Sequence, residues 1–333
     1  MTRHGADIAN KIMLLGLLAS VAVLAMPAAA CPIPVYQYSL EWWERDPYEI
    51  YVFDTGELTE EQETLVDRLE KIAAGNEDEV PANLRLRRVQ SDSEARLRAH
   101  SALRGATPES FPWMVVYYPT MSASVRTPVW MGELTAANLD ALLESPMRHR
   151  ISELLLNRTS VVWVLLESGD SDADNQAADL IGREVNRLEN TLVPPTLDGF
   201  GLDDIEISEI KFEFVRLSRD AADEQMFIEM LVKSEIDLVD YEDQPMLFPI
   251  FGRGLIMHAL VGRGINPRMI RDIAEFLTGP CSCTVKNANP GVDLLTAVDW
   301  GSRIQPMSQE FPDEASGLGG FMDSMDEARD IEP

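Results

Sequence analysis

Hydrophobic positions between residues 48 and 147 recur with two different spacings. Short apolar or alternating runs, which are typical of strands, occur at 50–53, 83–89, 111–119 and 127–132. Apolar residues three and four positions apart predict helices at 60–74 and 134–145, and a very polar stretch at 92–104 is also predicted to be helical. The expected order of elements is therefore β-α-β-α-β-β-α.

The same order of elements recurs between residues 158 and 279. Strands are predicted at 160–168, 210–217, 245–252 and 255–262, and helices at 174–192, 221–233 and 266–279. The last helix has Pro267 near its start and Gly279 at its end, the positions that helix termini prefer for these residues. Two halves with one order indicate a structural repeat.

A short local match supports the repeat. The turn after the first strand of each half carries an acid, a hydroxyl residue, a glycine and a second acid, and each turn leads into a helix. The two copies are Asp54-Thr55-Gly56-Glu57 and Glu167-Ser168-Gly169-Asp170.

This order of elements, with a proline opening the third strand, resembles the thioredoxin fold. The resemblance covers residues 48–147 and 158–279 and implies an α/β protein with two tandem thioredoxin-like domains, each with a mixed central sheet and helices on both faces. It also implies a cis proline before the third strand. Pro112 fits that position in the first half, and Pro245 fits it in the second, with Pro249 as a rival. Gly132 or Gly262 would close the fourth strand.

The chain departs from the redox members of that family at the usual catalytic position. Those proteins carry Cys-x-x-Cys at the start of the first helix, where the helix N-terminus lowers the thiol pKa. Here the two positions read TGELTEEQ and SGDSDADNQ, without a thiol. Both halves should therefore be redox-inactive there, and such domains commonly serve as binding or spacer modules.

The N-terminus has the features of an export signal. Arg3 and Lys11 accompany an apolar run, 12–26, that is too short for a spanning helix, and the small residues Ala28 and Ala30 suit cleavage after residue 30. The mature chain would begin at Cys31, which resembles the acylated first residue of a bacterial lipoprotein, although Ala28 replaces the usual Leu. Plain secretion is the alternative. The chain as a whole also resembles a group of exported, lipoprotein-like bacterial proteins, a likeness that implies no activity.

Residues 31–47 form an aromatic lead-in, expected to pack on the first domain; an interfacial belt above a lipid anchor is the alternative. Domain 1 is expected at 48–150, and domain 2 at 158–300 with a C-terminal extension that contains Cys-x-Cys. A flexible acidic tail is expected at 301–333.

Cys281 and Cys283 are the only thiols besides Cys31. They could form a strained, easily reduced disulfide or bind a soft metal such as Cu(I), although two thiolates without nearby His are an incomplete site. A bond from Cys31 to one of them is the third option. A structural disulfide in an oxidising compartment is the preferred interpretation over redox catalysis.

The alternation of Asp170, Asp172 and Asp174 is typical of a calcium loop. An EF-hand needs Gly and Glu where Asn175 and Ile181 stand, so helix capping explains the aspartates better. Weak surface calcium binding remains an alternative.

The sequence VFDTG at 52–56 also resembles the aspartic protease signature. That family is almost wholly β after the motif and pairs two aspartates. Here helices are predicted to follow, and the second copy has Glu167 in place of the aspartate.

The net charge of −28 argues against binding to nucleic acid. The sequence contains no Gly-rich phosphate loop, no Ser-His-Asp arrangement and no zinc spacing, so no cofactor is predicted. The expected function is non-enzymatic: an exported binding or scaffold protein of the bacterial periplasm or cell envelope, with an unidentified protein partner and a membrane contact through Cys31. The alternative is a thiol oxidoreductase or isomerase, or a soft-metal protein, acting through Cys281 and Cys283.

Overall fold

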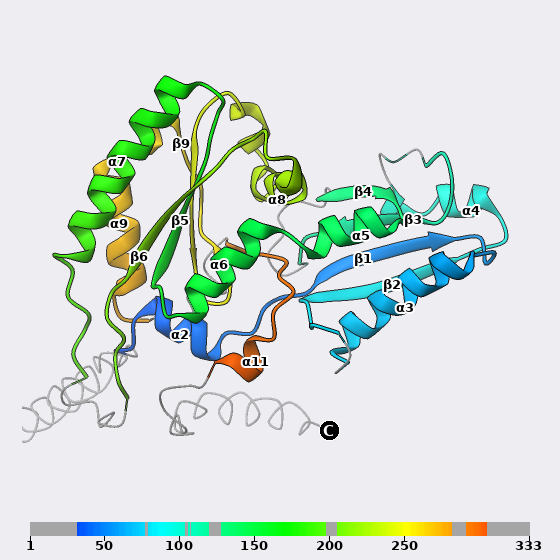
Figure 1. Ribbon diagram of the computed structural model, residues 1–333, viewed down its shortest axis with the longest axis horizontal. Coiled ribbons are helices and arrows are strands. Elements are labelled where there is room, and N and C mark those ends of the chain that lie inside the picture. The colour runs from blue at the N-terminus through cyan, green and yellow to red at the C-terminus, as the bar shows by residue number, and fades with distance from the viewer. Residues whose placement is uncertain are drawn as a thin grey trace, which may run out of the picture. The chain divides into compact units, whose positions relative to one another are not determined.

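The computed structural model describes residues 32–76, 79–103, 106, 108–119, 128–197, 205–281 and 291–304. All of them belong to one compact unit, which begins at Pro32. Within this part, the chain folds as a mixed α/β protein with two separate sheets (Figure 1).

The first sheet has the strand order β2-β1-β3-β4. β1 (Tyr48–Asp54) is central; it is parallel to β2 (Leu84–Gln90) and antiparallel to β3 (Trp113–Tyr117), which pairs antiparallel with β4 (Trp130–Glu133). Alternate side chains of β1 enter the hydrophobic cores on opposite faces of this sheet. Ile50 and Val52 pack with α3 (Glu60–Ala74) and α5 (Ala136–Leu143), whereas Phe53 packs with α4 (Glu94–Arg98) and the 3-10 turn η1 (Ser101–Leu103).

The second sheet repeats this arrangement around β5 (Val161–Leu166), which is buried throughout. β5 is parallel to β6 (Phe212–Leu217) and antiparallel to β7 (Met246–Phe251). The position of a fourth strand is shared by β8 (Leu255–Ile256) and β9 (Leu260–Val261), both antiparallel to β7, and β10 (Val292–Asp293) extends the sheet beyond β8.

Helices cover both faces of the second sheet. α7 (Ser171–Glu189) and α9 (Pro267–Thr278) share one core with Trp163 and Leu165 of β5. α6 (Pro146–Leu156) and α8 (Gln225–Val232), which follows the 3-10 turn η2 (Ala222–Glu224), share the opposite core with Val162 and Val164. A strand that is buried on both faces has apolar residues at consecutive positions. This pattern made β5 recognisable from the sequence.

The lead-in contains a helix, α2 (Val35–Trp42), and it packs on the second half of the chain. Val35 belongs to the core of α7 and α9, and Leu40 belongs to the core of α6 and α8. The expectation that residues 31–47 pack on the first domain was therefore wrong for α2, whereas Arg45 and Asp46, after the helix, do bind Asn83 of the first half. The helix carries polar residues on one face whose partners lie more than a hundred residues away, which the local pattern could not reveal.

Residues 291–304 connect the cores of the two halves. Val292 and Leu295 pack with the first sheet, whereas Leu294 and Trp300, the latter at the start of α11 (Trp300–Arg303), pack with the second. Asn83 stabilises this segment, because its side-chain amide donates to the Leu294 carbonyl over 3.1 Å and accepts from the backbone N–H of Thr296 over 3.0 Å. Residues 301–304 consequently belong to the fold and not to the tail.

The structure corrects several other expectations. Residues 92–103 form the five-residue α4 and η1 in place of one longer helix, and 255–262 contain two short strands in place of one. Among the described residues, the bond before Pro112 is the one cis peptide bond, as predicted, so those before Pro245 and Pro249 are trans.

No helix in the described ranges is long and apolar enough to cross a membrane.

The contact between β7 and α2 gives a test of how tightly the lead-in is packed. Gly252 has φ +58°, and a Cβ there would lie 2.5 Å from Oγ and 2.8 Å from Cβ of Ser39. Gly169 has φ +95° and open space around it. We expect Gly252→Ala to lower the free energy of unfolding by about 1–3 kcal/mol more than Gly169→Ala, because both changes strain the backbone and only the first overpacks. Chemical denaturation of both variants measures this, and equal losses would contradict the close contact.

Candidate functional site

The first strand-to-helix turn is held by a buried carboxylate. The Asp54 side chain is fully buried, its carboxylate accepts from Nε of Arg88 over 2.7 Å, and it also accepts the backbone N–H of Gly56 over 2.9 Å. Gly56 adopts φ +89°, which only glycine reaches without strain. Helix α3 then begins with a capping box between Thr59 and Gln62. The polar groups of this turn therefore serve its own structure.

The second turn is built in a similar way. Glu167 accepts from Nε of Arg216 over 2.5 Å, and Asp170 caps the first amides of α7. Asp174 is buried, and its two oxygens accept from the backbone N–H and hydroxyl of Ser168 and from the N–H of Gly169. The aspartates that were typical of a calcium loop thus include two that bind helix and loop amides.

The two turns match at the level of strand pairing. Arg88 lies opposite Val52 on β1, and its partner Asp54 comes two residues after Val52. Arg216 lies opposite Leu165 on β5, and its partner Glu167 comes two residues after Leu165. The four-residue match in the sequence is therefore accompanied by a matching arginine on the neighbouring strand of each half. Sequence reasoning missed both arginines, because an exposed Arg on a strand carries no local signal of its partner.

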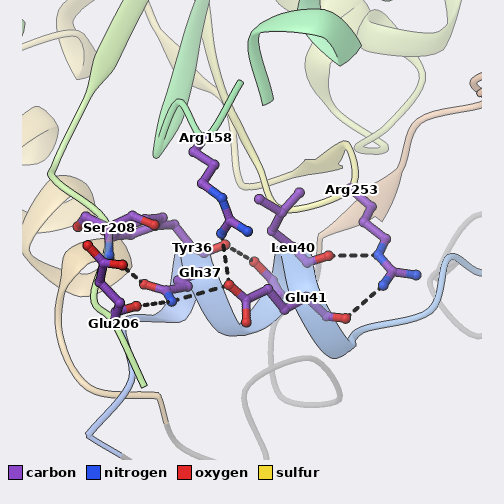
Figure 2. A network of polar contacts seen from close by, with 9 residues as sticks. Tyr36, Gln37, Leu40, Glu41, Arg158, Glu206, Ser208 and Arg253 are labelled. Carbon is purple, nitrogen blue, oxygen red and sulfur yellow. Dashed lines mark hydrogen bonds and ion pairs between the residues drawn. The ribbon is translucent and has the colours of Figure 1, made fainter. Parts of the chain in front are cut away.

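A second polar cluster surrounds α2 (Figure 2). Glu41 has a fully buried carboxylate, which lies 2.9 Å from Nη1 of Arg158 and 3.2 Å from the amide nitrogen of Gln37. Arg253 donates to the carbonyls of Leu40 and Glu41, both over 2.8 Å. A buried charge is tolerated when it is paired and hydrogen-bonded, so this cluster fixes the position of the helix.

The N-terminal half of α2 is bound to residues 205–210. Gln37 donates to the Glu206 carbonyl over 2.9 Å and accepts the backbone N–H of Ser208 over 3.0 Å. The Tyr36 hydroxyl donates to the Ser208 carbonyl over 2.6 Å, and burial raises the pKa of Tyr36 to about 12. Gln37 and Glu41 are four residues apart, and this helical spacing within an aromatic segment was the one sequence signal that could have revealed the helix.

The predicted cysteine sites are only partly visible. Cys281 is buried within the core of α7 and α9, and its backbone N–H donates to the Ile33 carbonyl over 2.7 Å. Cys31 and Cys283 lie outside the described residues. Within the described ranges, no group of three or more His, Cys, Asp and Glu side chains could hold a metal ion.

Two of the shallow hollows on the described surface are formed by the first half and by α8. One, of about 290 Å³, lies between β4 and α8 and is lined in part by Trp130, Met131 and Met226. The other, of about 460 Å³, lies beside α3 and β2 and includes Arg85 and Arg88. Neither is lined by Cys281.

No protein-family model and no curated protein matches this chain.

The Glu41–Arg158 pair can be tested by removing one charge at a time. We expect Glu41→Gln to lower the free energy of unfolding by about 1–3 kcal/mol, because the buried carboxylate gives up its charge-assisted hydrogen bonds with Arg158 and Gln37. Glu44→Gln, at an exposed acid three residues further along, should cost about 0.5 kcal/mol or less. In a double-mutant cycle with Arg158→Met, the two losses should not add. Additive losses measured by denaturation would show that the pair is not coupled.

The raised pKa of Tyr36 predicts a specific alkaline instability. Folded Tyr36 stays neutral up to about pH 12, whereas an unfolded tyrosine ionises near pH 10, so its contribution is complete below pH 10 and is lost as the pH rises through 12. Tyr36→Phe should be less stable than wild type at pH 8 by about 1 kcal/mol, since it loses the bond to Ser208. This deficit should shrink or reverse between pH 10 and 12. A deficit that stays constant over this range would contradict the assignment.

Proposed function

We propose that this chain is a non-enzymatic binding or scaffold protein of the bacterial cell envelope, built from two redox-inactive thioredoxin-like domains. The observation that carries this proposal is the pair of strand-to-helix turns. Immediately before the helix starts where redox members of that fold hold their cysteines, this chain holds the ion pairs Asp54–Arg88 and Glu167–Arg216, and no thiol follows in either turn. These groups bind the loop and strands around them and contain neither a nucleophilic thiol nor a base directed at a substrate.

The thioredoxin-like assignment is supported by the order of the strands. In each half the first strand is central, parallel to the second and antiparallel to the third, and the fourth strand lies beyond the third. In the first half, the helices after the first and fourth strands share one core, and the helix after the second strand belongs to the opposite one. The second half has the same distribution, with α7 and α9 on one side and α8 on the other.

The alternative function, thiol exchange through Cys281 and Cys283, is less well supported. A reactive cysteine needs a partly exposed, electropositive surrounding that stabilises the thiolate. Cys281 is fully buried, and it lies among apolar side chains such as Val35 and Leu277. This environment suits a structural role for Cys281.

Export and attachment complete the proposal. Residues 1–30 would serve as the signal peptide, and Cys31 would carry the lipid that holds the protein at a membrane. The folded body then acts as a module for an unidentified protein partner in the envelope, and the acidic surface disfavours nucleic acid.

The two functions differ in a reductase assay. We expect the mature chain to show no more insulin reduction than a buffer control in the presence of a thiol reductant, because neither first helix starts with a thiol. Cys281→Ala should behave like the wild type in this assay, and circular dichroism would confirm that it folds. Disulfide reduction or isomerisation by the wild type that is lost in Cys281→Ala would overturn the proposal in favour of the thiol-exchange alternative.

A further inference from the structure

We propose that the anchored protein lies directly against the membrane through the end of the second half that carries α2, with Val193 and Phe276 in contact with lipid. This inference rests on the proposed lipid at Cys31. It adds an orientation and a lipid-contacting surface to that proposal.

The chain has almost no length between the proposed anchor and the folded body. Ile33 is fully buried, and it is only two residues after Cys31, a distance that an extended chain spans in about 7 Å. Residues 33–35 are already paired with residues 279–281. Cys281 donates to the Ile33 carbonyl, Val35 donates to the Gly279 carbonyl over 3.1 Å, and Pro34 forms a bridge with Pro280.

The next residues cannot serve as a flexible linker, because α2 is bound on several sides. The buried Glu41 is paired with Arg158, and Arg253 binds the last carbonyls of the helix, as Figure 2 shows. Gly252, at the end of β7, lies against Ser39. Release of the helix would leave the Glu41 carboxylate without its pair, so a lipid on Cys31 brings this end of the body to the bilayer surface.

Two exposed apolar side chains lie close to this anchor point. Phe276 is 40% exposed in the last turn of α9, three residues before Gly279, which binds Val35. Val193 is 81% exposed and follows Leu192, which packs against the core that contains Val35. Pro194 and Pro195 continue the segment and are half-buried. Exposed apolar side chains next to an anchor gain free energy by entering the apolar boundary of a bilayer.

The exposed carboxylates at this end determine which lipid headgroup charge the surface tolerates. Glu206, Glu209 and Glu275 are exposed and adjoin residues that contact α2 or lie beside Phe276, and within residues 205–211 the two exposed acids outnumber the exposed base Lys211. Carboxylates are repelled by an anionic surface and tolerate a zwitterionic one. The contact therefore suits a bilayer rich in zwitterionic headgroups and should weaken as anionic lipid is added.

The chain contains matched controls at the opposite end of β7. Ile236 and Val239 are 75% and 45% exposed, and they come before β7, whereas Gly252 at the far end of β7 contacts α2. A six-residue strand spans about 20 Å, which separates the two pairs of positions. Both pairs are apolar and exposed, so they differ mainly in their distance from Cys31.

The test uses the photo-crosslinking residue p-benzoylphenylalanine at each of these four positions in the full-length chain, produced with its signal in bacterial cells. Mass spectrometry of the membrane fraction reports acylation of Cys31 and lipid adducts in the same sample. We expect about tenfold more lipid adduct at positions 193 and 276 than at 236 and 239, since only the first pair reaches the apolar boundary. In phosphatidylcholine vesicles, adding phosphatidylglycerol should reduce the adducts at 193 and 276.

The possible outcomes separate this inference from the proposed function. An unmodified Cys31 would overturn the lipid anchor and this orientation with it. An acylated Cys31 with equal adducts at all four positions, or with none at 193 and 276, would overturn the orientation alone and leave the anchored binding protein in place. Adducts that increase with phosphatidylglycerol would contradict the role of Glu206, Glu209 and Glu275.

Discussion

The burial of the Glu41 carboxylate is the constraint on which the N-terminal part of the structure depends. A charge without solvent must be paired, and Arg158 and Gln37 supply the pair and the hydrogen bond. Because Arg158 comes just before β5, this interaction places α2 at one end of the second sheet. Ser39 and Leu40 then meet the turn after β7 and the core of α6 and α8. The segment nearest the proposed anchor thus becomes part of the fold.

The two strand-to-helix turns are held by the same kind of interaction. In each half an acid at or just after the end of the first strand binds an arginine from the second strand, so the turn is held by an ion pair. Such pairs are structural, since both partners are engaged with each other and with nearby amides.

Most of the regular elements could be predicted from sequence, because their periodicity is local. The continuous apolar run of β5 predicts a buried strand, and the apolar residues three and four positions apart in α7 predict a helix. Pro112 was placed correctly before β3, whereas Pro245 was not recognised as a trans residue. The helix α2, the bridging segment 291–304 and the arginines Arg88 and Arg216 were missed. In each case the stabilising partners lie tens to hundreds of residues away, and a local pattern contains no information about them.

The sequence by itself determined the α/β class, the repeated order of elements, the acidic character and the absence of a thiol at either first helix. These properties depend on composition and on spacings within a few residues. Only the tertiary structure decided that the helix of the aromatic lead-in packs on the second half, that residues 291–304 enter both cores, and that the first acid of each turn pairs with an arginine of the neighbouring strand. Burial and charge pairing join distant parts of the chain, so they are decided only when the chain folds.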